Sequence, residues 1–160
     1  MEFSRREFSL QDFQELLAEQ EAIIHAPGAS DTDQAVRLAT VKAVAYRRFI
    51  AALAGGCQLT RPTLMQGVRI GPLGIYGTPF EVFQEIKNDI VEGAHAPIPL
   101  MLGLTNDALG YAPDRTAAAR GGYAADQVPL MQGTLPLANI HDELTAAALD
   151  LDRELFPVPL

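Results

Sequence analysis

The hydrophobic residues of this chain change their spacing near residue 60, from the period of a helix to the alternation of a strand. Before that point, two amphipathic segments carry their apolar residues along one face. The first follows Ser9 and Asp12, which form an S-x-x-D capping pattern, and the second follows a candidate cap at 32–33. Gly28 and Gly55 lie where such helices end. The sequence therefore predicts two helices before the change of period.

Strand-like patterns follow, and one weak pattern precedes the helices. Residues 63–70 and 73–76 surround a Gly-Pro turn and predict a β-hairpin, while residues 1–9 alternate weakly and predict an edge strand. Residues 96–104 are apolar with prolines near the start, which predicts a buried strand. The polar run 105–107 comes at the end of that strand, a place where functional side chains often lie.

Three more helices are predicted in the second half of the chain. Thr78 as a cap and Pro79 at the first helical position predict a helix that runs to about Glu92. A short helix near 115–120 interrupts an otherwise irregular Gly- and Pro-rich segment, and residues 139–155 carry an apolar stripe at helical spacing.

The mixture of helices and strands predicts an α/β fold in which helices are layered on a sheet. No internal repeat or long linker divides residues 1–160, so we expect a single unit. About three or four strands can be recognised, and the sheet is therefore expected to be completed by polypeptide outside this chain.

Composition excludes several classes of partner. The net charge of −8 argues against binding to nucleic acid or to an anionic membrane surface, because both require clustered Lys and Arg. No segment approaches the roughly 18 apolar residues of a transmembrane helix. No signal peptide precedes the first helix, so the protein is expected to be cytoplasmic if this chain is the full product. The single cysteine, Cys57, cannot form an internal disulfide.

Common catalytic motifs are missing from the sequence. It contains no phosphate-binding glycine loop, no H-E-x-x-H, no Cys-x-x-Cys and no G-x-S-x-G. His25, His95 and His141 are far apart and do not have the spacing of metal ligands, so we interpret them as helix-end or surface residues. The notable segment is 103–123, which places four glycines and two tyrosines within about twenty residues. Either a tight structural loop or a functional loop fits this pattern.

The order of residues in that segment resembles a known family. Gly-Leu-Thr-Asn-Asp-Ala-Leu-Gly-Tyr-Ala-Pro at 103–113, followed by Gly-Gly-Tyr at 121–123, is similar to the G-L-A-N-x-x-x-G-Y-x-P-T and G-G-Y-E motifs of neutral, non-lysosomal ceramidases. Residues 68–75 also resemble the hairpin that precedes a P-G-E-P-F turn in that family. The resemblance implies the C-terminal part of a larger α-β-β-α catalytic domain.

The resemblance also implies a chemistry and a set of site residues. In these ceramidases one zinc ion, held by two histidines, a glutamate and a tyrosine, activates a water that attacks the amide of a lipid. Tyr111 matches the metal-binding tyrosine, and Tyr123 matches a tyrosine that donates to the developing oxyanion. Asn106 matches the asparagine of the motif and is a second catalytic candidate. Gly110 and Gly122 are binding candidates.

The sequence departs from the family at two places. Thr78 occupies the position of the ligand glutamate, and a threonine hydroxyl is a poor ligand for zinc. Glu81 could replace that glutamate only if the turn were rebuilt. The two histidines and a catalytic serine belong to an N-terminal portion that nothing in residues 1–160 matches. We therefore expect this chain alone to bind no zinc.

Three functions remain open from the sequence. The chain could be a part or subunit of a ceramidase-like zinc amidohydrolase that acts on ceramide or a related lipid amide, completed by a chain or segment that supplies the N-terminal portion. It could instead be a metal-free relative that acts as a binding or interaction module. A third alternative is a hydrolase for a different amide or ester, with a rearranged metal shell.

Overall fold

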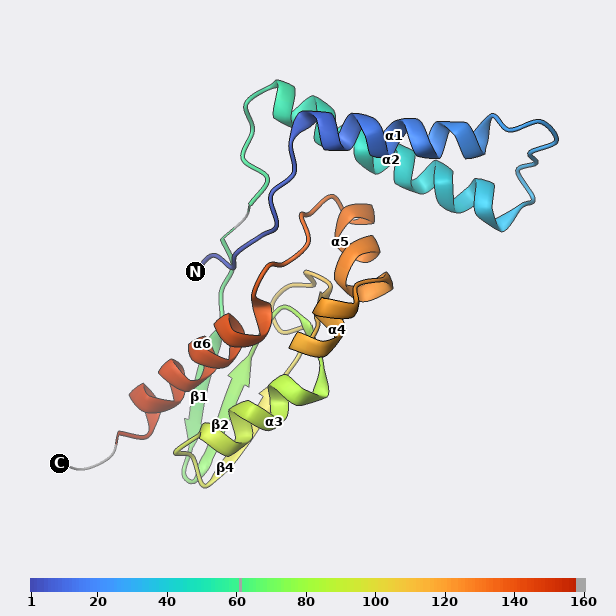
Figure 1. The fold of residues 1–160 in the computed structure, drawn as a ribbon. Coiled ribbons are helices and arrows are strands. Elements are labelled where there is room, and N and C mark those ends of the chain that lie inside the picture. Colours follow the sequence, from blue (N-terminus) through green and yellow to red (C-terminus); the bar gives the residue numbers. More distant parts are fainter. Residues whose placement is uncertain (61, 158–160) are drawn as a thin grey trace.

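A computed structural model describes residues 1–60 and 62–157, and Figure 1 shows that they form two regions. One region is a helical hairpin of α1 (Leu10–Ile24) and α2 (Gln34–Ala54), which projects from the rest of the chain. The other contains a small sheet and the remaining helices. This is the α/β class that the sequence predicts. None of the described helices is both long and apolar enough to cross a bilayer.

The helical hairpin begins and ends close to where the sequence predicts. Ser9 Oγ accepts from the Asp12 N–H at 3.1 Å, and the Asp12 carboxylate accepts from the Ser9 N–H at 2.6 Å, so the capping box is present. The N–H and the hydroxyl of Ser9 both donate to the Asp12 carboxylate, which holds the pKa of Asp12 below its usual range. Helix α1 stops at Ile24, before Gly28, and α2 is flanked by Asp33 and Gly55.

Phe13 lies at the centre of the hairpin core. Its ring is fully buried and stacks on the Phe49 ring with centroids 4.5 Å apart, and Tyr46 of α2 adjoins it. Leu130 and Leu135, from the far end of the sequence, complete the same cluster. These two leucines attach the hairpin to the second region.

The main sheet has the strand order β1-β2-β4. Strands β1 (Gln66–Ile70) and β2 (Leu73–Gly77) form the predicted antiparallel hairpin, and β4 (Ile98–Leu102) pairs with β2 in parallel. The prediction that the 96–104 strand is buried is wrong for this chain. Ile98, Leu100 and Leu102 are between 40% and 54% exposed, because no described element covers their face of the sheet.

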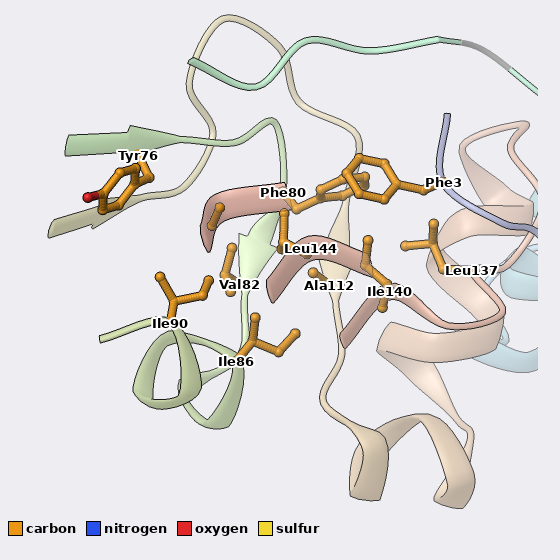
Figure 2. Close-up of a cluster of buried hydrophobic side chains, with 11 residues drawn as sticks. Phe3, Tyr76, Phe80, Val82, Ile86, Ile90, Ala112, Leu137, Ile140 and Leu144 are labelled. Atoms are coloured by element: carbon orange, nitrogen blue, oxygen red, sulfur yellow. The ribbon is translucent and has the colours of Figure 1, made fainter. Parts of the chain in front are cut away.

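Two helices cover the opposite face of the sheet. Helix α3 (Gln84–Gly93) packs against β4, and α6 (Ile140–Leu155) packs against β1 and β2. Figure 2 shows the core that results, with Ile86 and Ile90 of α3 meeting Leu144 of α6 around Phe80. The predicted helix over 139–155 is confirmed.

A buried carboxylate ties α6 to the sheet. Asp152 is 1% exposed, and its carboxylate accepts from the Tyr76 hydroxyl and from the backbone N–H groups of His95 and Ala96. Burial opposes ionisation of Asp152, but these three donors outweigh it and hold its pKa below the usual range. The contact fixes the end of α6 against the start of β4.

Several predicted elements differ from the structure. Residues 1–9 form one isolated bridge, Arg5 with Leu137, in place of an edge strand. The segment from 105 to 136 is less irregular than predicted: besides the expected α4 (Arg115–Arg120), it contains β5 (Tyr111–Ala112), η1 (Tyr123–Gln127) and α5 (Val128–Met131). The predicted helix at Pro79 begins five residues later, at Gln84.

Candidate functional site

The segment between β2 and α3 forms the base of the candidate site. Glu81 and Val82 are strand β3, which pairs in parallel with β5, so they do not belong to the first turn of a helix. Backbone bonds hold this segment on both sides: the Leu104 N–H donates to Phe80 O at 3.2 Å, and the Glu81 N–H donates to Gly110 O at 2.8 Å. Non-local pairing therefore overrides the local helix-capping pattern of Thr78 and Pro79.

The parallel pairing of β3 with β5 places Glu81 directly beside Tyr111. Val82 and Ala112 point into the core, so Glu81 and Tyr111, which precede them, both point outward on the opposite face of the two strands. Glu81 thus lies in a strand, on the same face as Tyr111, and a role for it in place of the family's glutamate stays a prediction. Glu81 and Tyr111 also line one open cavity of about 350 Å³, together with Phe83, Lys87 and Leu104.

The second tyrosine of the resemblance lies close to the first. The rings of Tyr111 and Tyr123 have centroids 6.3 Å apart, although the two residues belong to different elements. Phe83 packs edge-on against Tyr111 at 6.2 Å and holds one side of its ring. Tyr111 is partly buried, whereas Tyr123 is 62% exposed at the start of η1. Its phenol therefore has free access to a ligand or a partner.

The glycines of the segment shape the backbone around these tyrosines. Gly110 and Gly122 have φ values of +85° and +99°, a region that L-residues with a side chain rarely adopt. The Asp126 carboxylate accepts from the Gly122 N–H and also pairs with Arg6, so the Gly-Gly-Tyr turn is anchored to the N-terminal segment. Each glycine directly precedes one tyrosine of the pair, and the predicted role of both glycines in binding stays a prediction.

Asn106 and Thr78 occupy different surroundings from the two tyrosines. The Asn106 amide donates to Gln66 Oε1 on β1 at 2.6 Å, and its backbone has a φ of +66°. Thr78 is fully buried, and its hydroxyl has no hydrogen-bond partner among the described residues. The expected role of Thr78 as a helix cap is wrong, because Phe83 is the N-cap of α3.

The three histidines lie apart from one another and from this cavity. His25 is the C-cap of α1, and His95 follows α3. His141 is buried in the first turn of α6, where its Nδ1 accepts from the Arg115 N–H and its Nε2 lies 2.8 Å from the Asp89 carboxylate. Both bonds give His141 a structural role, and the contact of its Nε2 with the Asp89 carboxylate holds the pKa of Asp89 below its usual range.

The residues that this chain brings together do not fit a zinc ion by themselves. Zinc sites in proteins use three or four converging ligands, mostly histidine, cysteine and carboxylate. Tyr111 and Glu81 supply two ligand side chains at most, and within residues 1–60 and 62–157 no three His, Cys, Asp or Glu side chains cluster. Thr78, at the position of the family's glutamate, adds only a neutral hydroxyl.

The resemblance in the sequence singled out Tyr111, Tyr123 and Glu81, but it gave no sign of the other residues that lie around them. Glu81 joins the site through β3, whose two residues are too few to give a periodic signal, whereas Phe83 and Lys87 join it through the start of α3. The one local sign of a strand in the sequence is that a polar residue at 81 is followed by an apolar residue at 82. No protein-family model, no curated protein and no solved structure matches this chain.

Proposed function

We propose that this chain is a part or subunit of a ceramidase-like zinc amidohydrolase and is incomplete alone. The enzyme would hydrolyse the amide bond of ceramide or of a related lipid amide. The observation that carries the proposal is that the ring centroids of Tyr111 and Tyr123 lie 6.3 Å apart. These are the two residues that the family resemblance matches to a metal ligand and to an oxyanion donor. A second chain or segment would supply the remaining groups.

The proposed role of Tyr123 is to donate a hydrogen bond to the oxygen of the amide carbonyl as negative charge develops on it. A fixed phenol suits this role because a preorganised donor loses little free energy to reorientation during the reaction. Tyr123 follows a turn that Asp126 and Arg6 anchor, and its ring contacts that of Tyr111. Glu81 and Lys87 add charged groups to the adjoining cavity.

Removing the Tyr123 hydroxyl is expected to reduce amide hydrolysis strongly in the complete assembly. Loss of one oxyanion donor typically lowers kcat by about 10²–10³-fold. We would compare Tyr123→Phe with the wild type, using a fluorogenic N-acyl sphingoid amide and zinc-buffered solution. Tyr46→Phe is the matched control, because it removes a phenol from the hairpin core, outside the site. Equal rates for the Tyr123 variant and the wild type would remove this residue from the mechanism.

Thr78 supports one alternative function, a metal-free relative that acts as an interaction module. The residue offers no anionic ligand at the position that resembles the family's glutamate, and it is fully buried. A folded, complete assembly that hydrolyses no amide with zinc present would favour this alternative.

A further inference from the structure

One flank of the α1–α2 hairpin presents two rows of side chains at the spacing of a helix–helix seam. Intervals of three and four residues keep a row on one stripe of a helix. The row on α2 consists of five exposed residues, Arg37, Thr40, Val44, Arg47 and Ala51. The row on α1 consists of Gln14, Leu17, Glu21 and Ile24. Arg47 and Glu21 form an ion pair at 2.9 Å, so the two rows lie on the same side of the hairpin, which we call the free flank.

The opposite flank is already covered at the base of the hairpin. Ala45 and Phe49 of α2 are 4% and 2% exposed there, and Leu130 of α5 packs in the cluster that contains Phe49. Figure 1 shows that the hairpin extends well beyond α5. Val44, at the centre of the free flank, is by contrast 43% exposed. Within the described part of the chain, the row on α2 is therefore open along its whole length.

The side chains of the free flank suit packing against another helix. The Thr40 hydroxyl donates to Val36 O of its own helix at 2.8 Å, which leaves the Thr40 methyl group for contact. In the same row, the arginines at 37 and 47 lie on either side of Val44. An aliphatic centre between charged residues is typical of a helix seam whose partner is selected by charge.

Acidic and basic residues are divided between the two helices. Helix α1 has four acidic residues and no Lys or Arg, whereas α2 has four basic residues and no Asp or Glu. The acidic residues are Asp12, Glu15, Glu19 and Glu21, and the basic residues are Arg37, Lys42, Arg47 and Arg48. Charge therefore favours an acidic helix against α2 and a basic helix against α1. A second copy of the same hairpin supplies both.

Charge also selects one of two symmetric ways to place two hairpins flank to flank. With the two-fold axis parallel to the helices, α1 of each copy lies antiparallel on α2 of the other copy, and acidic residues face basic ones. With the axis across the helices, α1 lies on α1 and α2 on α2, so like charges oppose each other. The first arrangement forms an antiparallel four-helix bundle. Because it uses the same surface of both copies, the assembly stops at two.

The size of the free flank predicts a weak dimer. Helix α1 has 15 residues, so it is about 22 Å long, and two neighbouring helices are about 20 Å wide. The flank covers roughly 440 Å² in plan, whereas each partner of a stable interface contributes about 800 Å². Residues 10–54 carry six acidic and four basic residues, a net charge of −2 out of −8. Most of the charge that would repel a second copy therefore lies outside the hairpin.

We propose that the free flank binds a second copy of this chain, so that two hairpins form a four-helix bundle in which each α1 lies on α2 of the other copy. The interface uses none of the residues that line the candidate cavity. The proposal therefore stands apart from amide hydrolysis, and the failure of one leaves the other intact.

Sedimentation equilibrium of the purified chain tests for this dimer. From about 1 µM to about 1 mM, we expect a reversible equilibrium between monomer and dimer, because this range brackets the affinity of a weak interface. Raising the salt from about 0.05 M to about 0.5 M should weaken the dimer at least about fivefold, because exposed charge pairs are screened. Monomers alone at every concentration would overturn the proposal in favour of a different partner. A dimer that salt does not weaken, or a series of larger species, would contradict it too.

Substitutions of Gln14 test which helices face each other. Gln14 is uncharged and exposed in the row of α1. Against the basic α2 of the other copy, Gln14→Glu should strengthen the dimer and Gln14→Lys should weaken it. We expect about fivefold in each direction, because the two-fold axis places each change at two equivalent sites. Equal dissociation constants would contradict docking at this flank, and effects of opposite sign would place α1 on α1, against the proposal.

Two exposed aliphatic residues of α2 give a matched pair of variants. Val44 lies in the row, whereas Leu38, which is 39% exposed, lies about 140° around the helix from the centre of the row. Val44→Asp buries a carboxylate opposite the acidic α1 of the other copy and should weaken the dimer at least about tenfold, whereas Leu38→Asp leaves it unchanged. Circular dichroism should show equal helix content for both variants. Equal dissociation constants for the two variants would refute this interface.

Discussion

Replacement of Asp152 by alanine is expected to lower the free energy of unfolding by about 3–5 kcal/mol. The buried carboxylate accepts from the Tyr76 hydroxyl, from the His95 N–H at 2.6 Å and from the Ala96 N–H at 3.0 Å. Alanine leaves these three donors without an acceptor in a region that water does not reach. The change therefore loosens α6 from the sheet. Urea denaturation followed by circular dichroism measures the loss.

Asp150→Ala is the matched control for this substitution. Asp150 lies on the same helix but is exposed, and its one ion pair is with Arg153, a residue three positions along. Exposed pairs of this kind contribute about 0–1 kcal/mol. If Asp152→Ala and Asp150→Ala lower the free energy of unfolding by the same amount, the buried carboxylate of Asp152 does not anchor α6.

The same carboxylate makes stability depend on pH. Its donors lower the pKa of Asp152 in the folded chain, despite the opposing effect of burial, below the value of about 3.9 for an unfolded aspartate. The stabilisation is complete above the unfolded pKa and is lost as the pH falls through the folded pKa. We expect the unfolding free energy of the wild type to fall more steeply in acid than that of Asp152→Asn. If the unfolding free energies of the wild type and of Asp152→Asn fall equally as the pH is lowered, Asp152 is not the source of the pH dependence.

Phe13→Ala is expected to lower the free energy of unfolding by about 3–5 kcal/mol, which is typical for a fully buried phenylalanine. Phe13 is 0% exposed and lies between the rings of Phe8 and Phe49, with centroids 5.2 and 4.5 Å away. Its cluster is separate from the one that Figure 2 shows beneath the sheet. The cavity therefore weakens the hairpin first.

Hydrogen exchange distinguishes a local from a global effect of Phe13→Ala. We expect amides in α1 and α2 to lose more protection than amides in α3 and α6, because the hairpin has its own core. Leu10→Ala, at a residue of α1 that is 38% exposed, should leave protection nearly unchanged. A uniform loss over all four helices would show that the two cores unfold as one unit.

Local signals in the sequence predicted much of the fold. The capping box of Ser9 and Asp12 and the Gly71-Pro72 turn act through neighbouring residues, so the hairpin of helices and the hairpin of strands are both found where expected. Strands β3 and β5 are different. The two strands are separated by about thirty residues in the sequence, so no local pattern predicts their pairing. Because Thr78-Pro79 resembles the start of a helix, the prediction that Glu81 lies on a helix is wrong.

The error in β4 has another physical cause. Its residues are apolar on both faces, which predicts burial on both faces. In this chain α3 covers only one of them, and Leu100 remains 43% exposed. The sequence is therefore consistent with a strand that is buried in a larger assembly. The motif made Tyr111 and Tyr123 candidates, and their roles stay a prediction, whereas the neighbouring cavity depends on the long-range pairing of β3 with β5.

The most direct test of incompleteness is to measure lipid-amide hydrolysis by the isolated chain and by its complex with the chain or segment that supplies the missing groups, side by side in zinc-buffered solution. Tyr111 and Glu81 alone are too few ligands for a zinc site, so we expect no hydrolysis by the isolated chain. The complex should release sphingoid base and fatty acid, and Tyr123→Phe should suppress this release. Hydrolysis by the isolated chain, or a folded complex that releases neither product, would contradict the proposed function.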